Sequence, residues 1–318
     1  MSKVQTYAVV GTGSIGNAWA IVFARSRKSV RLFDIDPSRL VLARIDIEAR
    51  VTMLANNGLL EEEVSSVLAR ISYFDSLELV VKEAEYIQEC APERIEVKRE
   101  IFKNLDALTE SHVILASSSS AITTSVFATE VKHKGRCLIV HPGNPPYLLP
   151  VAEVVPAPFT DLEIVKKTME NLREIGMSPI LVHSEIEGFV FNRLQGAMLR
   201  EAYCLVRDGI VTASDLDRIV TQGLARRWTV VGPFATSALN VQGGIKAHVA
   251  RMGASYERMG ELRGQRDPWT PELVEKVSED IDQLFPIDDW NENVMRRDEA
   301  LLALTKLIAN NPTFDLGY

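Results

Sequence analysis

The chain has 318 residues, of which 46% are hydrophobic and 25% are charged. This length and composition are typical of a globular protein of about two domains, and they exclude a disordered or fibrous chain. The formal net charge of −8 argues against a nucleic acid or an anionic membrane surface as a partner, because either would attract a basic face.

The three cysteines, Cys90, Cys137 and Cys204, are too few and too scattered for a disulfide framework or a zinc site. They favour a reducing compartment. Residues 1–10 lack the pattern of a signal peptide, and no apolar run approaches the ~18 residues that a membrane span needs. We therefore expect a cytoplasmic protein that holds no metal.

Short β-branched runs alternate with longer stretches of helical periodicity over residues 1–186. This alternation predicts an α/β domain with a Rossmann-type, doubly wound and mainly parallel sheet, covered by helices on both faces. Strands are expected at 7–10, 30–33, 86–90, 113–116, 136–140, 151–155 and 179–183. Helices are expected between many of them, as at 37–55, 93–108 and 160–175.

Residues 187–318 are predicted to form a separate, all-α domain, because apolar positions recur at helical spacing and no convincing strand follows Phe189. The first helix is expected from Phe189 to Asp208, with Gly209 ending it. Ser214 and Asp217 have the spacing of a capped helix start. Further helices are expected at 243–262, 271–285 and 290–309.

Residues 11–16 read Gly-Thr-Gly-Ser-Ile-Gly, between the first predicted strand and a helical stretch. A glycine-rich turn that binds nothing is the alternative, but Asp34 ends the second strand where a dinucleotide fold places a ribose-binding acid. Gly11 would make the tight turn, Gly13 would let the backbone approach a pyrophosphate, and Gly16 would let the helix pack closely. The predicted cofactor is NAD, since the Asp34 carboxylate would repel a 2′-phosphate, although the nearby Arg39 leaves NADP open. The residues expected to bind it here are Gly11, Gly13, Ser14, Ile15, Gly16 and Asp34.

His141 ends a predicted strand, and Glu153 follows in the next one after a loop stiffened by four prolines. Strand–loop–strand geometry can bring the two side chains together, and a carboxylate beside an imidazole suits a general base. Taken alone, such a histidine is more often a satisfied core residue. The polar run Ser117–Ser120 ends a neighbouring strand, at the edge where ligands bind in open α/β sheets. The alternative to a ligand-binding role for this run is an ordinary turn.

With these motifs the sequence resembles the L-3-hydroxyacyl-CoA dehydrogenase superfamily and, within it, the branch of L-gulonate 3-dehydrogenase, also called lambda-crystallin. The resemblance runs over nearly the whole chain. The segments that carry it are GTGSIG at 11–16, ERIEVKREIF at 93–102, ILASSSSAITTS at 114–125, HPGNPPYLLPVAEVVP at 141–156, GFVFNRLQ at 188–195, DGIVTASDLD at 208–217 and GLARRWTVVGPF at 223–234.

The resemblance implies a role for each matching residue. His141 corresponds to the catalytic base, Glu153 to its charge partner, and Ser120 to the serine that binds the reacting oxygen. Asn192 corresponds to an asparagine that completes this polar site. The positions that line the nicotinamide half of the cofactor cleft are Glu93, Lys98 and Asn144.

The same resemblance implies NAD-dependent oxidation of the 3-hydroxyl of a small 3-hydroxy acid, such as L-gulonate, by a homodimer formed through the helical domain. Arg227 matches an arginine of the gulonate branch, and a guanidinium suits a free carboxylate. A charged, solvated helix end is the alternative for the pair of Arg226 and Arg227. Gly143 departs from the apolar residue expected there, a change that would widen or loosen the pocket.

Three other functions stay open at this point. The first is an L-3-hydroxyacyl-CoA dehydrogenase. The second is an L-carnitine dehydrogenase, for which Trp228 and Tyr147 could form an aromatic cage around the trimethylammonium group, although packing in the core is the more common role for such residues. The third is a structural protein of the crystallin kind that has no catalytic role.

Overall fold

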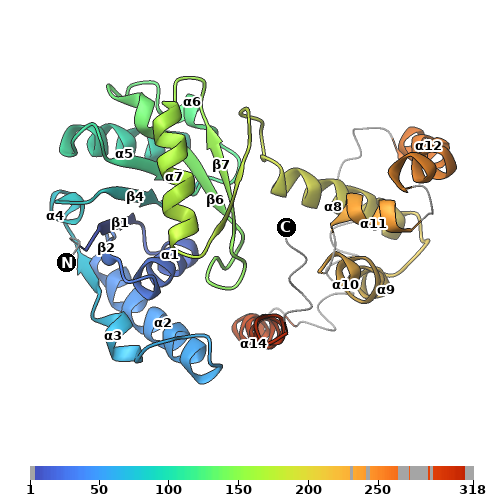
Figure 1. The fold of residues 1–318 in the computed structure, drawn as a ribbon, viewed down its shortest axis with the longest axis horizontal. Coiled ribbons are helices and arrows are strands. Elements are labelled where there is room, and N and C mark those ends of the chain that lie inside the picture. Colours follow the sequence, from blue (N-terminus) through green and yellow to red (C-terminus); the bar gives the residue numbers. More distant parts are fainter. Residues whose placement is uncertain are drawn as a thin grey trace. The chain divides into compact units, whose positions relative to one another are not determined.

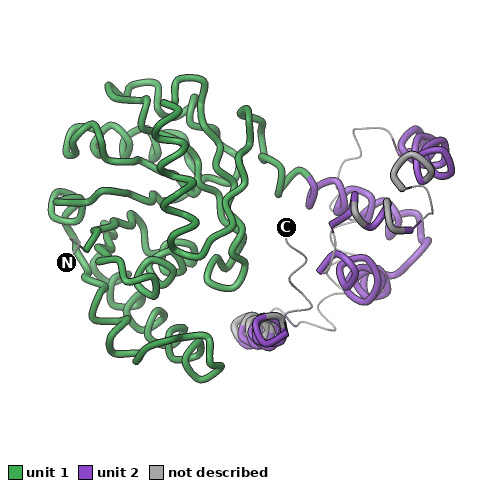
Figure 2. Tube along the Cα trace, viewed as in Figure 1, with its two compact units in different colours: residues 1–193 green, residues 194–318 purple. Residues whose placement is uncertain are grey.

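The structure is a computed structural model that describes residues 4–229, 232–240, 244–263, 272, 286 and 289–311. It divides into two compact units, residues 1–193 and 194–318 (Figure 2). The first unit therefore continues beyond residue 186, where the sequence predicted the end of the first domain. The helix expected at 271–285 lies almost wholly outside the described residues.

One eight-stranded sheet forms the centre of the first unit, in the order β3-β2-β1-β4-β5-β6-β7-β8 (Figure 1). All neighbouring strands are parallel except β6 and β7. The order reverses between β1 and β4, which is the switch point of a Rossmann-type sheet and confirms the predicted fold class. The strands are β1 (Thr6–Val10), β2 (Ser29–Phe33), β3 (Ile71–Phe74), β4 (Tyr86–Glu89), β5 (Ile114–Ser117), β6 (Cys137–Pro142), β7 (Val151–Pro156) and β8 (Ser178–Leu181).

The seven predicted strands are confirmed, with ends shifted by one or two residues, but β3 was missed. Of its four residues only Ile71 is buried, so neither an apolar run nor an alternating pattern marks it in the sequence. Strand β3 pairs with β2 at one edge of the sheet.

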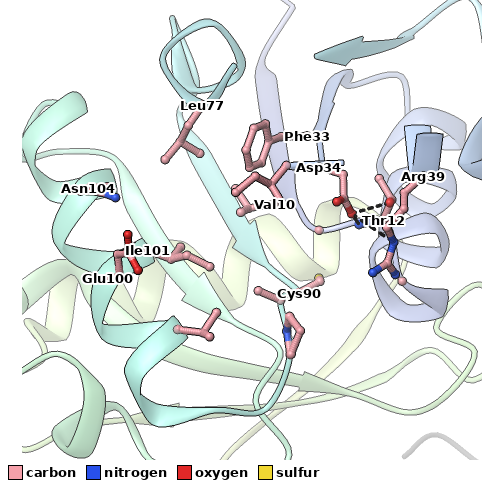
Figure 3. Close-up of a pocket in the computed structure, with 16 residues that line it drawn as sticks. Val10, Thr12, Phe33, Asp34, Arg39, Leu77, Cys90, Glu100, Ile101 and Asn104 are labelled. Carbon is pink, nitrogen blue, oxygen red and sulfur yellow. Dashed lines mark hydrogen bonds and ion pairs between the residues drawn. The ribbon is translucent and has the colours of Figure 1, made fainter. Parts of the chain in front are cut away.

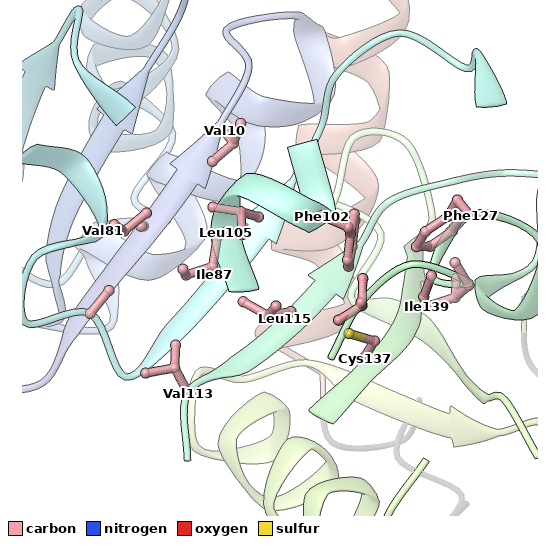
Figure 4. Close-up of a cluster of buried hydrophobic side chains, with 14 of the residues drawn as sticks. Val10, Val81, Ile87, Phe102, Leu105, Val113, Leu115, Phe127, Cys137 and Ile139 are labelled. Atoms are coloured by element: carbon pink, nitrogen blue, oxygen red, sulfur yellow. The ribbon is translucent and has the colours of Figure 1, made fainter. Parts of the chain in front are cut away.

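Helices cover both faces of this sheet because successive strand residues point to opposite sides. On one face α4, α5 and α6 pack over residues such as Val10, Leu115 and Ile139 (Figure 4). On the other face Phe23 of α1 lies edge-on against Tyr7 of β1, with ring centroids 5.1 Å apart. The helices of this unit are α1 (Ser14–Arg25), α2 (Pro37–Asn56), α3 (Val64–Leu68), α4 (Leu77–Val81), α5 (Ile95–Leu108), α6 (Thr124–Phe127) and α7 (Leu162–Glu174).

The described part of the second unit is helical and contains no strand, as predicted. Its helices are α8 (Phe191–Arg207), which begins in the first unit, α9 (Ala213–Ile219), α10 (Ala225–Trp228), α11 (Pro233–Leu239), α12 (Gly244–Arg263) and α14 (Trp290–Ala309), with a π-helical turn at Val220–Leu224. Within the described residues, none of the helices has the length and apolar character that crossing a membrane requires.

Two predicted helix starts were wrong. Helix α8 begins at Phe191, two residues late, because Gly188 and Phe189 adopt positive φ angles of 76° and 50° that a helix cannot include. Helix α9 is capped by Thr212 and not by Ser214: the Thr212 hydroxyl accepts a hydrogen bond from the backbone N–H of Asp215. The sequence contains both capping patterns two residues apart, Thr212 with Asp215 and Ser214 with Asp217, and the helix uses the first.

Candidate active site

The glycine loop between β1 and α1 has a backbone that excludes side chains at two of its three glycines. Gly11 has a φ of +106°, and a Cβ there would lie 2.7 Å from the carbonyl oxygen of Cys90. A Cβ on Gly16 would lie 1.9 Å from the carbonyl oxygen of Gly11. A Cβ on Gly13 would meet nothing within 4 Å, so the loop is open at the point where a pyrophosphate is expected to approach the N-terminus of α1.

Asp34 ties this loop to the end of β2. Its Oδ2 accepts hydrogen bonds from the backbone N–H and the hydroxyl of Thr12, at 3.0 and 2.6 Å, and its Oδ1 accepts from the N–H of Asp36. Arg39 Nε lies 3.7 Å from the same carboxylate. Asp34 thus has part of its acceptor capacity committed to the loop, and what remains faces a cavity.

That cavity, of about 550 Å³, lies beside the loop and has the apolar walls that an adenine ring requires (Figure 3). Asp34 and Arg39 lie at one side of it, and Leu77, Ile101 and Asn104 at another. No sequence motif marks these last residues as cavity residues, because only the fold brings α4 and α5 to the cavity. The open face of Gly13, the acid at Asp34 and this adjoining space fit NAD.

His141 and Glu153 meet because β6 and β7 pair in antiparallel register. The two residues are direct partners across the ladder, so their side chains leave the same face of the sheet side by side. His141 Nδ1 lies 2.8 Å from Glu153 Oε2, and both residues are more than nine-tenths buried. No described residue bonds to Nε2, the other ring nitrogen of His141.

Glu153 also holds the N-terminus of α8. Its Oε1 accepts hydrogen bonds from the backbone N–H groups of Val190 and Phe191, at 2.7 and 2.9 Å. Burial alone would raise the pKa of Glu153, but the hydrogen bonds from His141 and from these two N–H groups lower it below its usual value. The charged carboxylate therefore links β7, the imidazole and the helix that carries Asn192.

The hydroxyls of the four serines at the end of β5 have different environments. Ser117 donates to the buried carboxylate of Glu89, and Ser119 donates to Glu93 at 2.5 Å. Ser118 contacts Trp19, Gln88 and Cys90. Ser120 is the one serine whose hydroxyl has no hydrogen-bond partner in the described part of the chain, so its hydroxyl is available to a ligand.

Glu93 fixes the loop on which Ser120 lies. Its Oε1 accepts from the Ser119 hydroxyl and from the backbone N–H groups of Ser120, Ala121 and Ile122. Burial raises the pKa of Glu93, and these donors together with Lys98 lower it below its usual value. From the other side, Asn192 Nδ2 donates to the carbonyl oxygen of Ser120 at 2.9 Å.

A cavity of about 320 Å³ brings most of the predicted reaction-site residues together. It is lined by Ile15, Cys90, Ala91, Glu93, Ser118, Ser120, His141, Pro142 and Asn144. Glu153, Asn192 and Lys98 are not among them. Lys98 is fully buried, with Nζ 2.9 Å from Glu89 and 3.5 Å from Glu93. Glu89 was missed because nothing in the sequence distinguishes a buried strand-end acid that pairs with a lysine on the next helix.

The structure shows the surroundings of three residues that were expected to shape the pocket or to bind the substrate. Gly143 does not widen the pocket, because a Cβ there would lie only 3.1 Å from Leu149 and from Val151. Tyr147 is buried, with its hydroxyl 2.5 Å from Arg50 Nη1, so it offers no open ring face to a cation. Arg227 is exposed on α10, in the second unit.

Comparison with known proteins identifies the family. The model of the NAD binding domain of 3-hydroxyacyl-CoA dehydrogenase matches residues 6–186, and that of the C-terminal domain of the same enzymes matches residues 188–279. The chain belongs to the 3-hydroxyacyl-CoA dehydrogenase family. It is therefore an NAD-dependent oxidoreductase that acts on CH–OH groups.

Relatives within the family differ in what they are named for. Lambda-crystallin of Oryctolagus cuniculus is 37% identical over 303 residues, which cover 94% of this chain and 95% of the relative. An L-carnitine dehydrogenase of Oceanobacillus iheyensis is 35% identical over 289 residues, 89% of each chain. Among solved structures, 5-formyl-3-hydroxy-2-methylpyridine 4-carboxylic acid 5-dehydrogenase, an NAD+-dependent dismutase, superposes with a TM-score of 0.83 at 25% identity and covers 97% of this chain and 100% of its own. The resemblance inferred from the motifs is confirmed.

Proposed function

We propose that this dehydrogenase oxidises the secondary 3-hydroxyl of a small, free 3-hydroxy carboxylic acid, L-gulonate-like, to the 3-keto acid. The observation that carries the proposal is the buried His141–Glu153 pair at 2.8 Å, because His141 lines one cavity with Ser120, whose hydroxyl has no hydrogen-bond partner among the described residues. NAD, when bound, supplies the hydride acceptor.

Residues of the chain would accept the proton of the substrate hydroxyl. With Nδ1–H donated to Glu153, neutral His141 keeps a free lone pair on Nε2, which takes the proton of the substrate hydroxyl. Glu153 stabilises the imidazolium that forms, and its lowered pKa keeps it charged near neutral pH. Ser120 binds the reacting oxygen, and Asn192 acts through the Ser120 carbonyl by holding the loop.

A free acid is favoured over a thioester by the NPPY loop and by Arg227 in the gulonate-like segment. We propose Arg227 as the anchor of the substrate carboxylate. Its neighbour Arg226 on the same helix is also exposed and serves as the matched control. Arg227→Ala should raise the KM for free acids about tenfold, the worth of a charged hydrogen bond, while Arg226→Ala leaves it unchanged. An effect on thermal stability alone would make Arg227 a surface charge.

The test of the function is NADH formation at 340 nm with purified protein, NAD and four substrates in parallel: L-gulonate, L-3-hydroxybutyrate, L-carnitine and L-3-hydroxybutyryl-CoA. We expect turnover of a free acid and none of the CoA ester. Turnover of the ester alone would contradict the proposal, and NADH binding without any turnover would favour a structural role.

L-Carnitine is the second candidate, because a named L-carnitine dehydrogenase is 35% identical to this chain. Carnitine is itself a free 3-hydroxy acid, so the same proton chemistry serves it. Since Tyr147 is buried against Arg50, a cage for the trimethylammonium group would have to use other aromatic residues, such as the half-buried Trp228. A carnitine rate above the gulonate rate would favour this candidate.

We also propose that the protein is a homodimer that pairs through its helical unit. Large apolar side chains are exposed on the described part of that unit, among them Ile210, Phe234 and Leu262 at 70%, 83% and 81%. Exposed apolar side chains of this kind mark interaction surfaces. Sedimentation equilibrium should give twice the chain mass, and a monomer at micromolar concentration would contradict the proposal.

A further inference from the structure

The hydroxyl of Ser118 has its hydrogen-bonding roles fixed by its neighbours. Trp19 Nε1 donates to Ser118 Oγ at 3.1 Å, and an indole N–H can only donate. Gln88 Nε2 donates to the same oxygen at 2.7 Å. The orientation of the Gln88 amide is set because its Nε2 also donates to the carbonyl oxygen of Val140, which can only accept.

A hydroxyl has two lone pairs and one proton. With both lone pairs of Ser118 filled by Trp19 and Gln88, the proton must be donated in another direction. In the described part of the chain the atom within reach is Cys90 Sγ, at 3.3 Å. Burial raises the pKa of Cys90 to about 12, so the sulfur is a neutral thiol and a weak acceptor.

Both Ser118 and Cys90 line the cavity that holds His141 and Ser120. An oxygen of a ligand in that cavity is a better acceptor than the thiol, and it can replace Cys90 as the partner of the Ser118 proton. Ser118 therefore differs from Ser120, whose hydroxyl has no partner among the residues that the structure describes and can either donate or accept.

We propose that Ser118 is a dedicated hydrogen-bond donor to an acceptor oxygen of the ligand in this cavity. Two sources carry that chemistry: the carboxamide oxygen of the nicotinamide and an oxygen of the hydroxy acid. The first source follows from the use of NAD by the family, and the second rests on the proposed function.

The experiment compares Ser118→Ala with the wild type in two measurements. The Kd for NADH is measured by fluorescence without substrate, and the KM for the acid is measured at saturating NAD. Ser66→Ala, at an exposed serine of α3 in the same unit, is the matched control and should change neither. Loss of this hydrogen bond in Ser118→Ala should raise the affected constant, either the Kd for NADH or the KM for the acid, about three- to tenfold.

A rise in the NADH Kd assigns the donor to the carboxamide. In that case thio-NADH, whose carboxamide oxygen is replaced by sulfur, should bind less well than NADH to the wild type but equally well to Ser118→Ala. A rise in KM with an unchanged NADH Kd assigns the donor to the substrate. If both constants stay at the wild-type values while the melting temperature falls, the hydroxyl only satisfies Trp19 and Gln88, and the proposal is overturned.

A second variant covers the case in which Ser118→Ala does not fold. Ser118→Cys keeps a small polar side chain but donates weakly, so it should shift the same constant in the same direction by a smaller factor. An unchanged constant in that variant would also overturn the proposal. The NADH measurement stands even if no free acid is turned over, so failure of the proposed function is distinguishable from failure of this inference.

Discussion

The two ends of the site are built in different ways. The glycine loop is one contiguous segment, and its residues are dictated by backbone: a positive φ at Gly11 and an approach that leaves no room for a Cβ at Gly16. The reaction end draws on segments far apart in the sequence, and the carboxylates of Glu93 and Glu153 join these segments by accepting hydrogen bonds from them. The shape of the loop therefore requires residues without a side chain, whereas the shape of the reaction end is set by hydrogen bonds that side chains make.

The largest effect should come from the imidazole at the reaction end. We expect His141→Ala to lower kcat at least about 10²-fold, the usual worth of a positioned base. The Kd for NADH, measured by fluorescence, should stay within about twofold of the wild type, since the glycine loop is untouched. His112→Ala, at an exposed histidine of the same unit, is the control. Turnover that survives in His141→Ala would remove the proposed base.

The glycine loop offers a matched pair of substitutions. A Cβ at Gly16 would overlap the Gly11 carbonyl, so Gly16→Ala should destabilise the unit by about 3 kcal/mol in chemical unfolding. A Cβ at Gly13 meets no protein atom within 4 Å, so Gly13→Ala should keep its stability but bind NADH about tenfold more weakly. If the two variants behave alike, the space beside Gly13 is not where the cofactor binds.

Asp34 tests how far the cofactor end relies on a side chain. Removing the carboxylate in Asp34→Ala should weaken NADH binding about tenfold and narrow the preference for NADH over NADPH. Because Asp34 also holds Thr12, Thr12→Val measures the part due to the loop alone. If Asp34→Ala and Thr12→Val weaken NADH binding equally, Asp34 acts on the loop and not on the cofactor.

The smallest effect is on the pH dependence of stability. The pKa of Glu153 is lowered in the folded protein from an ordinary value of 4.5. Its contribution to stability is therefore fully present above that value and is lost as the pH falls through the lowered pKa of the folded state. Glu153→Gln should flatten the decline in the free energy of unfolding below about pH 4.5, measured by urea denaturation. An unchanged slope would show that the folded-state pKa is not lowered.

Much of the fold was predictable because it follows local rules. Seven strands, the helices that alternate with them and the glycine loop are each signalled by contiguous residues, whose backbone and burial needs are met within one element. The pairing of His141 with Glu153 could be expected as well, since a short loop between adjacent strands places them opposite each other. Strand β3 and the start of α8 escaped prediction because a partner strand and two positive φ angles decide them.

The sequence by itself determined the family, the dinucleotide loop and the residue types of the reaction end. Only the tertiary structure decided what each polar group does. Glu93 proved to hold the loop of Ser120, Lys98 to be buried against Glu89, and Ser118 to have both its lone pairs filled. The physical reason is that a strand or a turn is specified by neighbours in the chain, whereas the role of a hydroxyl or a carboxylate depends on donors and acceptors that other elements bring to it.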